Sequence, residues 1–357
     1  MIVLRPAESS DYDGVVACLR RNGMPAWTPG EWRALWDEHP SRSDFEGVPR
    51  GFVLDADASI VGTISSLWAK YRFRGRDLRA VVAGRAAVDA EHRANSIRLF
   101  GEQLQHAGAD LYLNGSASVT TSKVMDAMKV PRVPQAGNDV ALLWPARAMV
   151  VARVGLSRRR VPLARLLARP VASLLEAASA IRLHSFAKPR GVDEVSRFDS
   201  EFDAFWQSMQ ETTSQLIAVR DRATLTWRYG PQVAAGEAHI MVARKAGLLV
   251  GYAVLVRRPR PSLGVTAYVI HDLQCLNDEG EAIMALLSAA WRRTRRDGLD
   301  LLEWSGFSGT RRRLAERAAV LPYRLDVWQA YYSTKDPVLK RELAVTDAWS
   351  FSSYDSD

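Results

Sequence analysis

The chain has 357 residues, of which 47% are apolar and 25% are charged, a composition that is typical of globular proteins and excludes an intrinsically disordered chain. Its length fits two domains of ordinary size. The formal net charge of +8 comes from residues 151–190, which carry nine Lys or Arg and one acid, whereas the other 39 basic and 39 acidic residues balance; this excludes a nucleic-acid-binding surface spread over the whole fold.

The sequence also predicts the compartment. Met1 is followed by a short apolar run that ends at Pro6, so no signal peptide is predicted, and no window approaches the roughly 18 apolar residues of a membrane span. Cys18 and Cys275 stand far apart in apolar surroundings and are predicted to be buried free thiols. We therefore expect a cytoplasmic protein.

The first 150 residues predict an alternation of strands and helices. The run 2–6 is predicted to be a strand, and 12–21 is predicted to be a helix that follows cap-type residues. Three tryptophans in a second helical stretch, at 27, 32 and 36, are interpreted as core residues. The further elements are strands at 51–54, 60–65, 79–88 and 110–114 and helices at 96–106 and 121–128. The mostly apolar run 79–88 is typical of a central, buried strand.

The second half repeats this order with different residues. The predicted elements are helices at 202–209, 279–296 and 311–319 and strands at 239–243, 248–256, 265–276, 299–304 and 327–332. A repeat of this size indicates duplicated α/β domains, each with a mixed, mainly antiparallel sheet flanked by helices. The expected boundaries are 1–150 and 191–335, with a basic linker at 151–190 and a tail at 336–357.

The linker contains an apolar run with basic residues at intervals, 161–183. Because Pro170 interrupts it, we expect either two short helices or one kinked helix. The favoured interpretation is a linker that packs its apolar face on a domain. The alternative is an amphipathic helix that rests on an anionic membrane surface, which would make the protein peripheral to the inner membrane.

A candidate anion-binding segment follows the strand at 79–88. The segment comprises Val88, Arg93, Ala94, Asn95, Ser96, Ile97 and Arg98, which the resemblance given below implies to be cofactor-binding residues. They lead into the helix predicted from Ser96, where unpaired backbone amides and the helix dipole favour phosphate oxygens. The Ser96 hydroxyl can cap the helix, and Arg98 adds positive charge.

This loop and the order of elements around it resemble the GNAT superfamily of acyl-CoA-dependent N-acyltransferases. The family's loop runs Arg or Gln, two residues, Gly, one residue, Gly or Ala; Arg93 matches its first position, whereas Ser96 and Arg98 replace the small residues. The resemblance implies two tandem GNAT-like domains and acetyl-CoA or another acyl-CoA as co-substrate. No metal is expected, because the six histidines and two cysteines show no metal-ligand spacing.

The family usually places a tyrosine on the short helix at 121–128, where it protonates the departing thiolate. Alignment puts Met125 at this position, and methionine has no proton to donate. The resemblance therefore leaves three possibilities: another group protonates the thiolate, the thiolate leaves unaided, or the domain is not catalytic.

The second domain departs further from the family pattern. Its loop at 276–281 is acidic and would repel pyrophosphate, so we expect the cofactor in the first domain. The segments 220–229 and 349–357 resemble tandem GNAT-like proteins of exopolysaccharide and cell-envelope biosynthesis, which implies an amine acceptor such as an amino sugar. Arg228 and Tyr229 are interpreted as structural residues.

The reaction requires a general base and hydrogen-bond donors for the thioester carbonyl. The residues considered as base are Asp89, Glu91, His92, His271, Asp272 and Glu303. We select Glu91, His271, Asp272 and Glu303 as the catalytic candidates; of His271 and Asp272 only one can face a cleft, because adjacent strand residues point to opposite faces. The resemblance implies that backbone amides of 81–88 hold the carbonyl oxygen.

Three functions stay open. The first is an acyl-CoA-dependent N-acyltransferase that acts on a small-molecule or glycan-precursor amine. The second is a Fem-like transferase that uses aminoacyl-tRNA, for which the basic segment 151–190 would suit the nucleic acid. The third is a non-catalytic GNAT-fold scaffold or binding protein, which Met125 and the altered loop favour.

Overall fold

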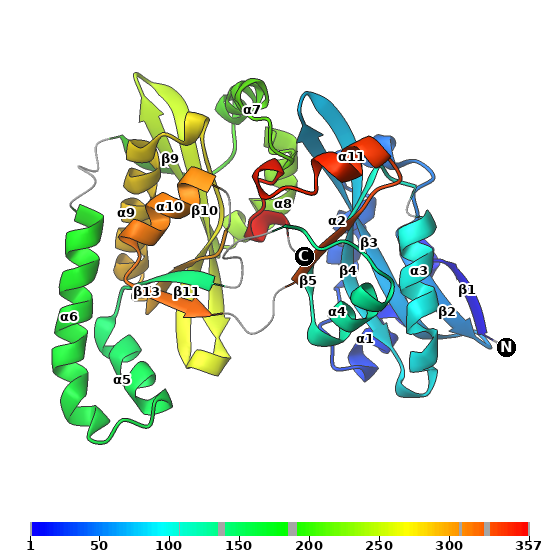
Figure 1. Cartoon of the computed structure of the whole chain (residues 1–357), viewed down its shortest axis with the longest axis horizontal. Coiled ribbons are helices and arrows are strands. Elements are labelled where there is room, and N and C mark those ends of the chain that lie inside the picture. Colours follow the sequence, from blue (N-terminus) through cyan, green and yellow to red (C-terminus); the bar gives the residue numbers. More distant parts are fainter. Residues whose placement is uncertain are drawn as a thin grey trace.

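A computed structural model describes residues 2–106, 108–134, 140–184, 191–306, 309–324 and 329–355. Within these residues the chain forms two mixed sheets of seven strands each, flanked by helices (Figure 1). The predicted α/β class with two sheet-based domains is confirmed.

In the first half, the strands and helices up to residue 127 follow the predicted order, and one strand and one helix that were not predicted come before the linker helix. They are β1 (Ile2–Pro6), α1 (Tyr12–Arg21), α2 (Pro29–Trp36), β2 (Gly51–Ala56), β3 (Ser59–Phe73), β4 (Arg76–Val88), α3 (Ser96–His106), β5 (Leu111–Ala117), α4 (Val119–Ala127), β6 (Val140–Pro145), α5 (Ala148–Arg158) and α6 (Ala164–His184). β3 and β4 are longer than predicted because their hairpin turns only at Arg74 and Gly75, whose φ angles are 47° and 80°.

In the second half, most predicted elements are present and three further strands and two helices join them. The elements are β7 (Val192–Val195), α7 (Ser200–Thr212), β8 (Ile217–Ala218), α8 (Arg222–Ala234), β9 (Ala238–Lys245), β10 (Leu248–Arg260), β11 (Val265–Cys275), α9 (Gly280–Arg296), β12 (Leu301–Trp304), α10 (Gly309–Ala318), β13 (Leu321–Arg324), β14 (Gln329–Ser333) and α11 (Pro337–Glu342). Residues 327 and 328 of the strand predicted at 327–332 lie outside the described residues.

Local sequence explains where α2 begins and which way it faces. The Thr28 side chain accepts from the Glu31 amide, the Glu31 side chain accepts from the Thr28 amide, and Pro29 occupies the first turn. Trp32 and Trp36 lie four residues apart on one face and are 5% and 0% exposed. The interpretation of these tryptophans as core residues is confirmed.

The two halves of the chain exchange strands: β6 joins the second sheet, and β8 and β14 join the first. The first sheet has the order β1-β2-β3-β4-β5-β14, with β8 paired to β3, and the second has the order β13-β6-β12-β11-β10-β9-β7. β6 therefore comes from the first half of the chain but lies beside β12, and β14 comes from the second half but lies beside β5. Neither sheet is built from one continuous stretch of sequence.

The tail after β14 returns to the first sheet and then runs between the sheets. Arg74 pairs with Glu342 of α11 at 2.8 Å, and the Leu216 amide donates to the carbonyl oxygen of Ala348 at 2.6 Å. Gly306 and Ser352 form an antiparallel bridge. The last described residues thus join the two halves.

The largest hydrophobic core lies between the sheets. It combines Tyr71 and Val82 of the first sheet with Tyr252 and Val254 of the second, and Trp349 of the tail completes it. Helices α7 and α8 and the tail lie between the two sheets (Figure 1). Because this core contains residues of both halves, the two domains stabilise each other.

Each sheet also packs against its own helices. Cys18 of α1, Phe100 of α3 and Met125 of α4 belong to the core of the first domain. Trp291 of α9 and Cys275 belong to that of the second. Cys18 and Cys275 are free and buried, as predicted.

Residues 164–184 form one helix, α6, with Pro170 inside it, so the two-helix alternative is not what forms. Ala168 and Ala172 of α6 are buried. Among the residues that the structure describes, none of the helices combines the length and the apolarity that crossing a bilayer requires.

Candidate functional site

The first sheet opens at its central strand. β4 pairs in parallel with β5 only from Ala80 to Val82, and beyond this point β5 pairs on its other side with β14. β4 itself continues along β3 as far as Val88. The β4 edge after Val82 therefore has no ladder with β5, and its backbone groups face what we call the β4–β5 gap, between 83–88 and 114–117.

A bulge marks the start of this gap. The β3–β4 register shifts between the pairs Ile64↔Ala86 and Ser66↔Ala83, so that Gly84 and Arg85 together oppose Ser65 and β4 has one additional residue. Such bulges bend a strand and redirect its backbone. Gly84, Arg85 and Ala86 are half-buried, although β4 lies in the middle of the sheet.

The predicted cofactor-binding segment lies directly after β4. A 3-10 helix at Ala90–Asn95 leads into α3, which begins at Ser96. Arg93, Ala94, Ile97 and Arg98 are exposed, and Val88, Asn95 and Ser96 are half-buried. The segment is accessible and its arginines give it positive charge.

One detail of this segment differs from the expectation. The Ser96 amide donates to the carbonyl oxygen of Arg93, so it is already paired within the 3-10 helix and is not a free donor. A 3-10 turn at a helix start closes such bonds because it shortens their spacing to three residues. The groups that remain for an anion are the Ser96 hydroxyl, the side chains of Arg93 and Arg98, and the positive end of the α3 dipole.

Asp89 anchors this segment to α1. Its carboxylate accepts from the Arg21 guanidinium and from the Asn22 side-chain amide, each at 2.7 Å. Burial favours a higher pKa for Asp89, but the hydrogen bonds from Arg21 and Asn22 outweigh it and the pKa is lowered below its ordinary value. Asp89 is therefore an ionised anchor.

The second domain has a corresponding gap. β11 pairs in parallel with β12 only from Ala267 to Ile270, and the β10–β11 register shifts directly afterwards, so that His271 is the additional residue. This repeats the position of the bulge in β4. The two central strands thus have the same local shape.

Side chains and the tail fill the gap of the second domain. The Arg311 guanidinium donates to the Leu273 carbonyl oxygen and to Ser350 Oγ, each at 3.0 Å, and it pairs with Asp278 at 2.9 Å. The Ser353 hydroxyl donates to the carbonyl oxygen of Ser305 at 3.2 Å. A phosphate-bearing cofactor would have to displace these contacts and approach Asp278.

Asp272, a predicted catalytic residue, is enclosed in a buried network. It is 0% exposed and accepts from Arg220 Nε at 3.0 and 3.1 Å and from Tyr252 Oη at 2.7 Å. Gln274 Nε2 donates to it at 2.9 Å. The carboxylate is satisfied by these donors, which indicates a structural ion pair.

The other catalytic candidates lie apart from one another. His271 Nδ1 is 2.9 Å from Tyr229 Oη, and burial lowers the pKa of this histidine well below its ordinary value. Glu303 is 4% exposed and is held by Arg260 Nε at 2.8 Å in the second sheet. Glu91 is exposed on the 3-10 helix beside the first-domain gap.

Met125 has the position that alignment predicts but no access to solvent. It is 0% exposed and shares its core with Ala117 and Tyr331. The Tyr331 hydroxyl comes from β14 and donates to Asp126 Oδ1 at 3.0 Å. The α4 helix therefore presents an apolar side chain where the family has its proton donor.

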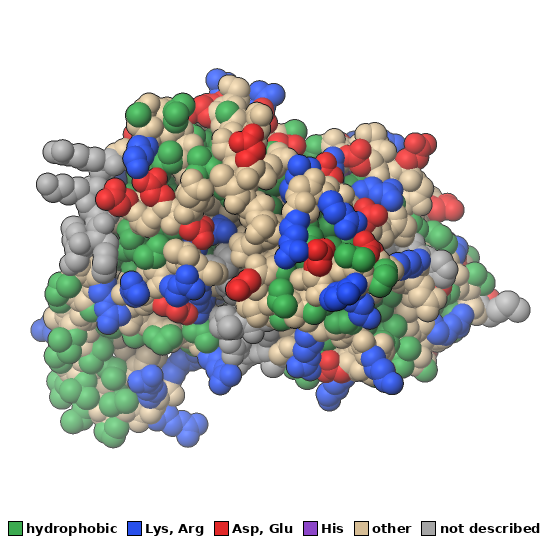
Figure 2. Space-filling view, turned by 45° about the horizontal axis from the view of Figure 1, so that its top comes forward, with side chains coloured by type: hydrophobic (Ala, Val, Ile, Leu, Met, Phe, Trp, Pro, Cys, Tyr) green, Lys and Arg blue, Asp and Glu red, His purple; other side chains and the backbone are tan. Residues whose placement is uncertain are grey.

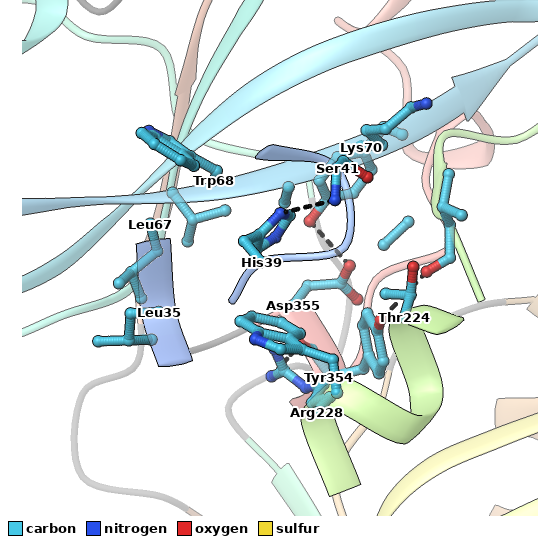
Figure 3. Close-up of a pocket in the computed structure, with 16 residues that line it drawn as sticks. Leu35, His39, Ser41, Leu67, Trp68, Lys70, Thr224, Arg228, Tyr354 and Asp355 are labelled. Carbon is cyan, nitrogen blue, oxygen red and sulfur yellow. Dashed lines mark hydrogen bonds between the residues drawn. The ribbon is translucent and has the colours of Figure 1, made fainter. Parts of the chain in front are cut away.

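A pocket between the domains was not predicted from the sequence. It encloses about 80 Å³ and is bounded by α2, β3, β4, β8, α8 and the tail (Figure 3). Its lining residues are Leu35, His39, Ser41, Leu67, Trp68, Ala69, Lys70, Tyr71, Val82, Ala218, Val219, Thr224, Trp227, Arg228, Tyr354 and Asp355. Val82, the last β4 residue paired with β5, lines this pocket and stands directly before the β4–β5 gap.

Three polar groups of the pocket have a shifted pKa or lack a hydrogen-bond partner among the described residues. His39 Nδ1 accepts from the Ser41 amide at 3.1 Å, and burial lowers the pKa of His39 to about 4. Burial raises the pKa of Asp355, which accepts from Tyr71 Oη at 2.9 Å. The indole N–H of Trp68 is buried without a hydrogen-bond partner among the described residues.

No sequence signal assembled this pocket. His39 and Trp68 come from the first half of the chain, Trp227 from α8 and Asp355 from the tail. Residues 228 and 355 lie in the segments 220–229 and 349–357, and only the packing of the tail between the sheets brings them together.

The structure is similar to solved acyltransferases. A GCN5-related N-acetyltransferase from Anabaena variabilis ATCC 29413 shares 13% identity at a TM-score of 0.54, covering 92% of this chain and 72% of that one. A probable N-acyltransferase from Enterococcus faecalis V583 shares 11% at 0.57 with the same coverage. The N-myristoyltransferase of Saccharomyces cerevisiae, solved with bound myristoyl-CoA, shares 10% at 0.55, covering 100% of this chain and 85% of that one.

These likenesses show that the chain has the GNAT fold in a two-domain arrangement similar to that of N-myristoyltransferase. No protein-family model and no curated protein sequence matches the chain.

Proposed function

We propose that this chain transfers an acyl group from an acyl-CoA to an amine, and that the acyl-CoA binds to the first domain. One observation carries the proposal: the central strand β4 bulges at Gly84 and separates from β5 directly before an accessible, basic helix start. Acetyltransferases and a myristoyltransferase with bound myristoyl-CoA share the fold. The corresponding gap of the second domain is filled by Arg311 and the tail.

In this proposal the pantetheine arm enters the β4–β5 gap and the pyrophosphate lies at the start of α3. Arg93 and Arg98 neutralise phosphate charge, and the Ser96 hydroxyl donates a hydrogen bond. Backbone amides of β4 beyond Val82 donate to the thioester carbonyl oxygen and stabilise the negative charge that develops on it.

The interdomain pocket supplies the acceptor side. Because Val82 borders both the gap and the pocket, an amine in the pocket would meet the thioester carbonyl there. The rings of Trp68 and Trp227 offer cation–π contact to an amine that binds there, and Asp355 offers a hydrogen bond. The resemblance to envelope-polysaccharide proteins makes an amino sugar the proposed acceptor.

The chemical step is a substitution at the thioester. The amine nitrogen attacks the carbonyl carbon, a C–N bond forms, the C–S bond breaks, and CoA leaves as a thiolate that takes up a proton. Glu91 is exposed at the pyrophosphate end of the gap, roughly 20 Å along β4 from Val82, and Asp272 and Glu303 are each held by an arginine. The amine therefore binds in its neutral form and gives up its proton to solvent. Met125 cannot protonate the thiolate.

Thermal denaturation with acetyl-CoA and with longer acyl-CoAs tests the cofactor site. A ligand that binds the folded state stabilises it by about 2.7 kcal/mol at a hundredfold excess over its Kd. We expect the wild-type melting temperature to rise, and Ser96→Glu to abolish the rise because it places a carboxylate where phosphate would bind. Ser173→Glu, on the exposed side of α6, is the matched control and should keep it.

An unchanged rise in Ser96→Glu would show that the α3 start is not the site, and no rise with any acyl-CoA would overturn the proposed function. Release of free CoA thiol with glucosamine, a nucleotide-linked amino sugar or a peptide amine as acceptor then identifies the substrate class. Glu91→Gln should keep kcat within about twofold in this assay, because Glu91 lies at the pyrophosphate end of the gap; a loss of about a hundredfold would instead make Glu91 the base.

A further inference from the structure

The helical hairpin of α5 and α6 lies at the outer side of the second domain (Figure 1). Ala168, Ala172, Ser179 and Leu183 of α6 are buried at between 0% and 5% exposure. These positions are four, seven and four residues apart, so they form one face of the helix. This face packs against α5, β6, α9 and α10 and accounts for the attachment of the hairpin.

The opposite face of the hairpin is also apolar, but it is exposed. The large aliphatic side chains on it are Leu163 at 71%, Leu166 at 72%, Leu167 at 43%, Leu174 at 71% and Ile181 at 64% exposure. Pro170 and Ala177 continue the same stripe and are exposed too. A surface helix of a globular protein normally has one apolar face and a polar one, so a second apolar stripe indicates a further apolar environment.

The charge of the hairpin points to the nature of that environment. Residues 151–184 contain seven arginines and a single acid, Glu176. Arg158, Arg159 and Arg160 are exposed at the turn of the hairpin, beside Leu163. Glu176 lies 3.5 Å from Arg295, which offsets its charge. Figure 2 shows hydrophobic side chains with basic ones among them at the lower left, where the hairpin lies.

The space beneath the hairpin has the same character. A pocket of about 370 Å³ lies between α5, α6 and the second sheet and is lined mainly by aliphatic side chains. Val154 and Leu175 line it from the two helices, and Arg158 and Arg159 stand among its lining residues. The hairpin therefore combines apolar surface with arginines both on its exposed side and on the side that faces this pocket.

We propose that the α5–α6 hairpin binds the surface of an anionic lipid bilayer. Leu163, Leu166 and Leu174 enter the boundary between headgroups and acyl chains, and the arginines contact the headgroup phosphates, with their aliphatic stems along the apolar layer. The helix lies in the plane of the membrane surface, which agrees with the finding that no described helix suits a span.

A second copy of the chain is a weaker explanation of the exposed stripe. A two-fold interface would bring the same surface of both copies together, and with it two sets of arginines such as Arg158, Arg159 and Arg160. The two sets would repel each other without acids nearby to balance them. An anionic bilayer satisfies the leucines and the arginines together.

Co-sedimentation of the full chain with vesicles tests this inference. We expect binding to vesicles of phosphatidylglycerol and phosphatidylcholine in equal parts, binding at least tenfold weaker to pure phosphatidylcholine, and a loss of binding as salt is raised. Wild-type protein that stays in the supernatant with the anionic vesicles would overturn the inference.

Matched variants separate the two contributions. Leu166→Ser with Leu174→Ser should weaken binding by about tenfold or more for each leucine. Arg158→Glu with Arg159→Glu and Arg160→Glu should weaken it by roughly fivefold or more for each position. Leu248→Ser, which removes an equally exposed leucine (73%) from the β9–β10 turn, should leave it unchanged.

Equal binding by all variants would overturn the inference, and so would a wild-type dimer in size-exclusion chromatography that Leu166→Ser with Leu174→Ser converts to monomer. A polarity-sensitive dye on Leu174→Cys gives a direct readout, because Cys18 and Cys275 are buried and should not react. The emission of the dye should shift to the blue when anionic vesicles are added. An emission maximum that remains the same as in water would contradict insertion.

Discussion

At the residue scale, the most unusual feature is an ion pair that is almost completely removed from water. Arg220 is 1% and Asp272 0% exposed, and their side chains lie 3.0 Å apart. Arg220 also lies 3.8 Å from Asp355 of the tail, and its guanidinium is 4.1 Å from the centre of the Tyr354 ring. The pair therefore connects the second sheet to the chain end.

Removal of one partner should destabilise the protein because it leaves the other charge buried. We expect Asp272→Asn to lower the free energy of unfolding, measured with urea, by about 3 kcal/mol or more. The control Asp203→Asn breaks the exposed pair with Arg222, at 3.3 Å, and should cost about 1 kcal/mol or less. Equal losses in both variants would show that burial does not strengthen the Arg220–Asp272 pair.

His39 makes stability depend on pH. Burial lowers the pKa of His39 from 6.5 to about 4, so the unfolded chain takes up a proton at a higher pH than the folded one. Stability is fully present above pH 6.5 and is lost as the pH falls towards 4, by about 2 kcal/mol between about pH 7 and about pH 5. Urea denaturation at both pH values should show a smaller loss for His39→Gln.

His271, whose pKa burial also lowers, contributes a loss of the same sign in wild type and in His39→Gln. The difference between the two proteins therefore isolates His39. A loss of equal size in both proteins would mean that His39 is protonated alike in the folded and unfolded states.

At the element scale, β2 begins with a glycine whose backbone lies close against β3. Gly51 has a φ of 151°, and a Cβ atom there would lie 2.2 Å from the carbonyl oxygen of Ile64. Only glycine avoids this overlap with backbone. Gly47, four residues earlier, has a φ of 78°, but a Cβ atom there would have no neighbouring atom within 4 Å.

The two glycines offer a matched pair of substitutions. Gly51→Ala should lower the free energy of unfolding by about 3 kcal/mol or more, because β2 or β3 must move. Gly47→Ala should cost about 1–2 kcal/mol, since it meets only the backbone strain of a left-handed conformation. A cost for Gly51→Ala no greater than that for Gly47→Ala would show that the strands shift freely.

Several elements were predictable because their signals are local. The helix at 12–21 and the strand at 2–6 coincide with α1 and β1, and the hairpin of β9 and β10 turns at Ala246 and Gly247, between the two predicted strands. β6 was not predicted, because it has only six residues and the sequence around it shows little clear periodicity. The strand predicted at 60–65 was too short, because the part of β3 after residue 65 is stabilised by its pairing with β4 and β8.

At the scale of the whole molecule, the exchange of β6 and β14 makes each sheet depend on both halves of the chain. The largest core, between the sheets, also takes residues from both halves. Two domains of this kind cannot separate without breaking strand pairs and exposing apolar surface.

We therefore expect a single cooperative unfolding transition. Differential scanning calorimetry should give one peak with a calorimetric enthalpy close to the van't Hoff enthalpy. A chain of residues 1–150 alone should fail to form a stable fold, because it lacks β14 and has no second sheet for β6. Two separate peaks, or a stable 1–150 fragment, would contradict this.

The sequence alone determined the α/β class, the duplication, the accessible basic segment after β4 and the apolar, basic character of 161–183, because these depend on local periodicity and composition. The tertiary structure decided the rest: it enclosed Asp272 with Arg220, filled the second gap with Arg311 and the tail, and formed the pocket of His39, Trp68 and Asp355. These features depend on contacts between residues that are distant in the sequence, which strand exchange and burial create and no local pattern encodes.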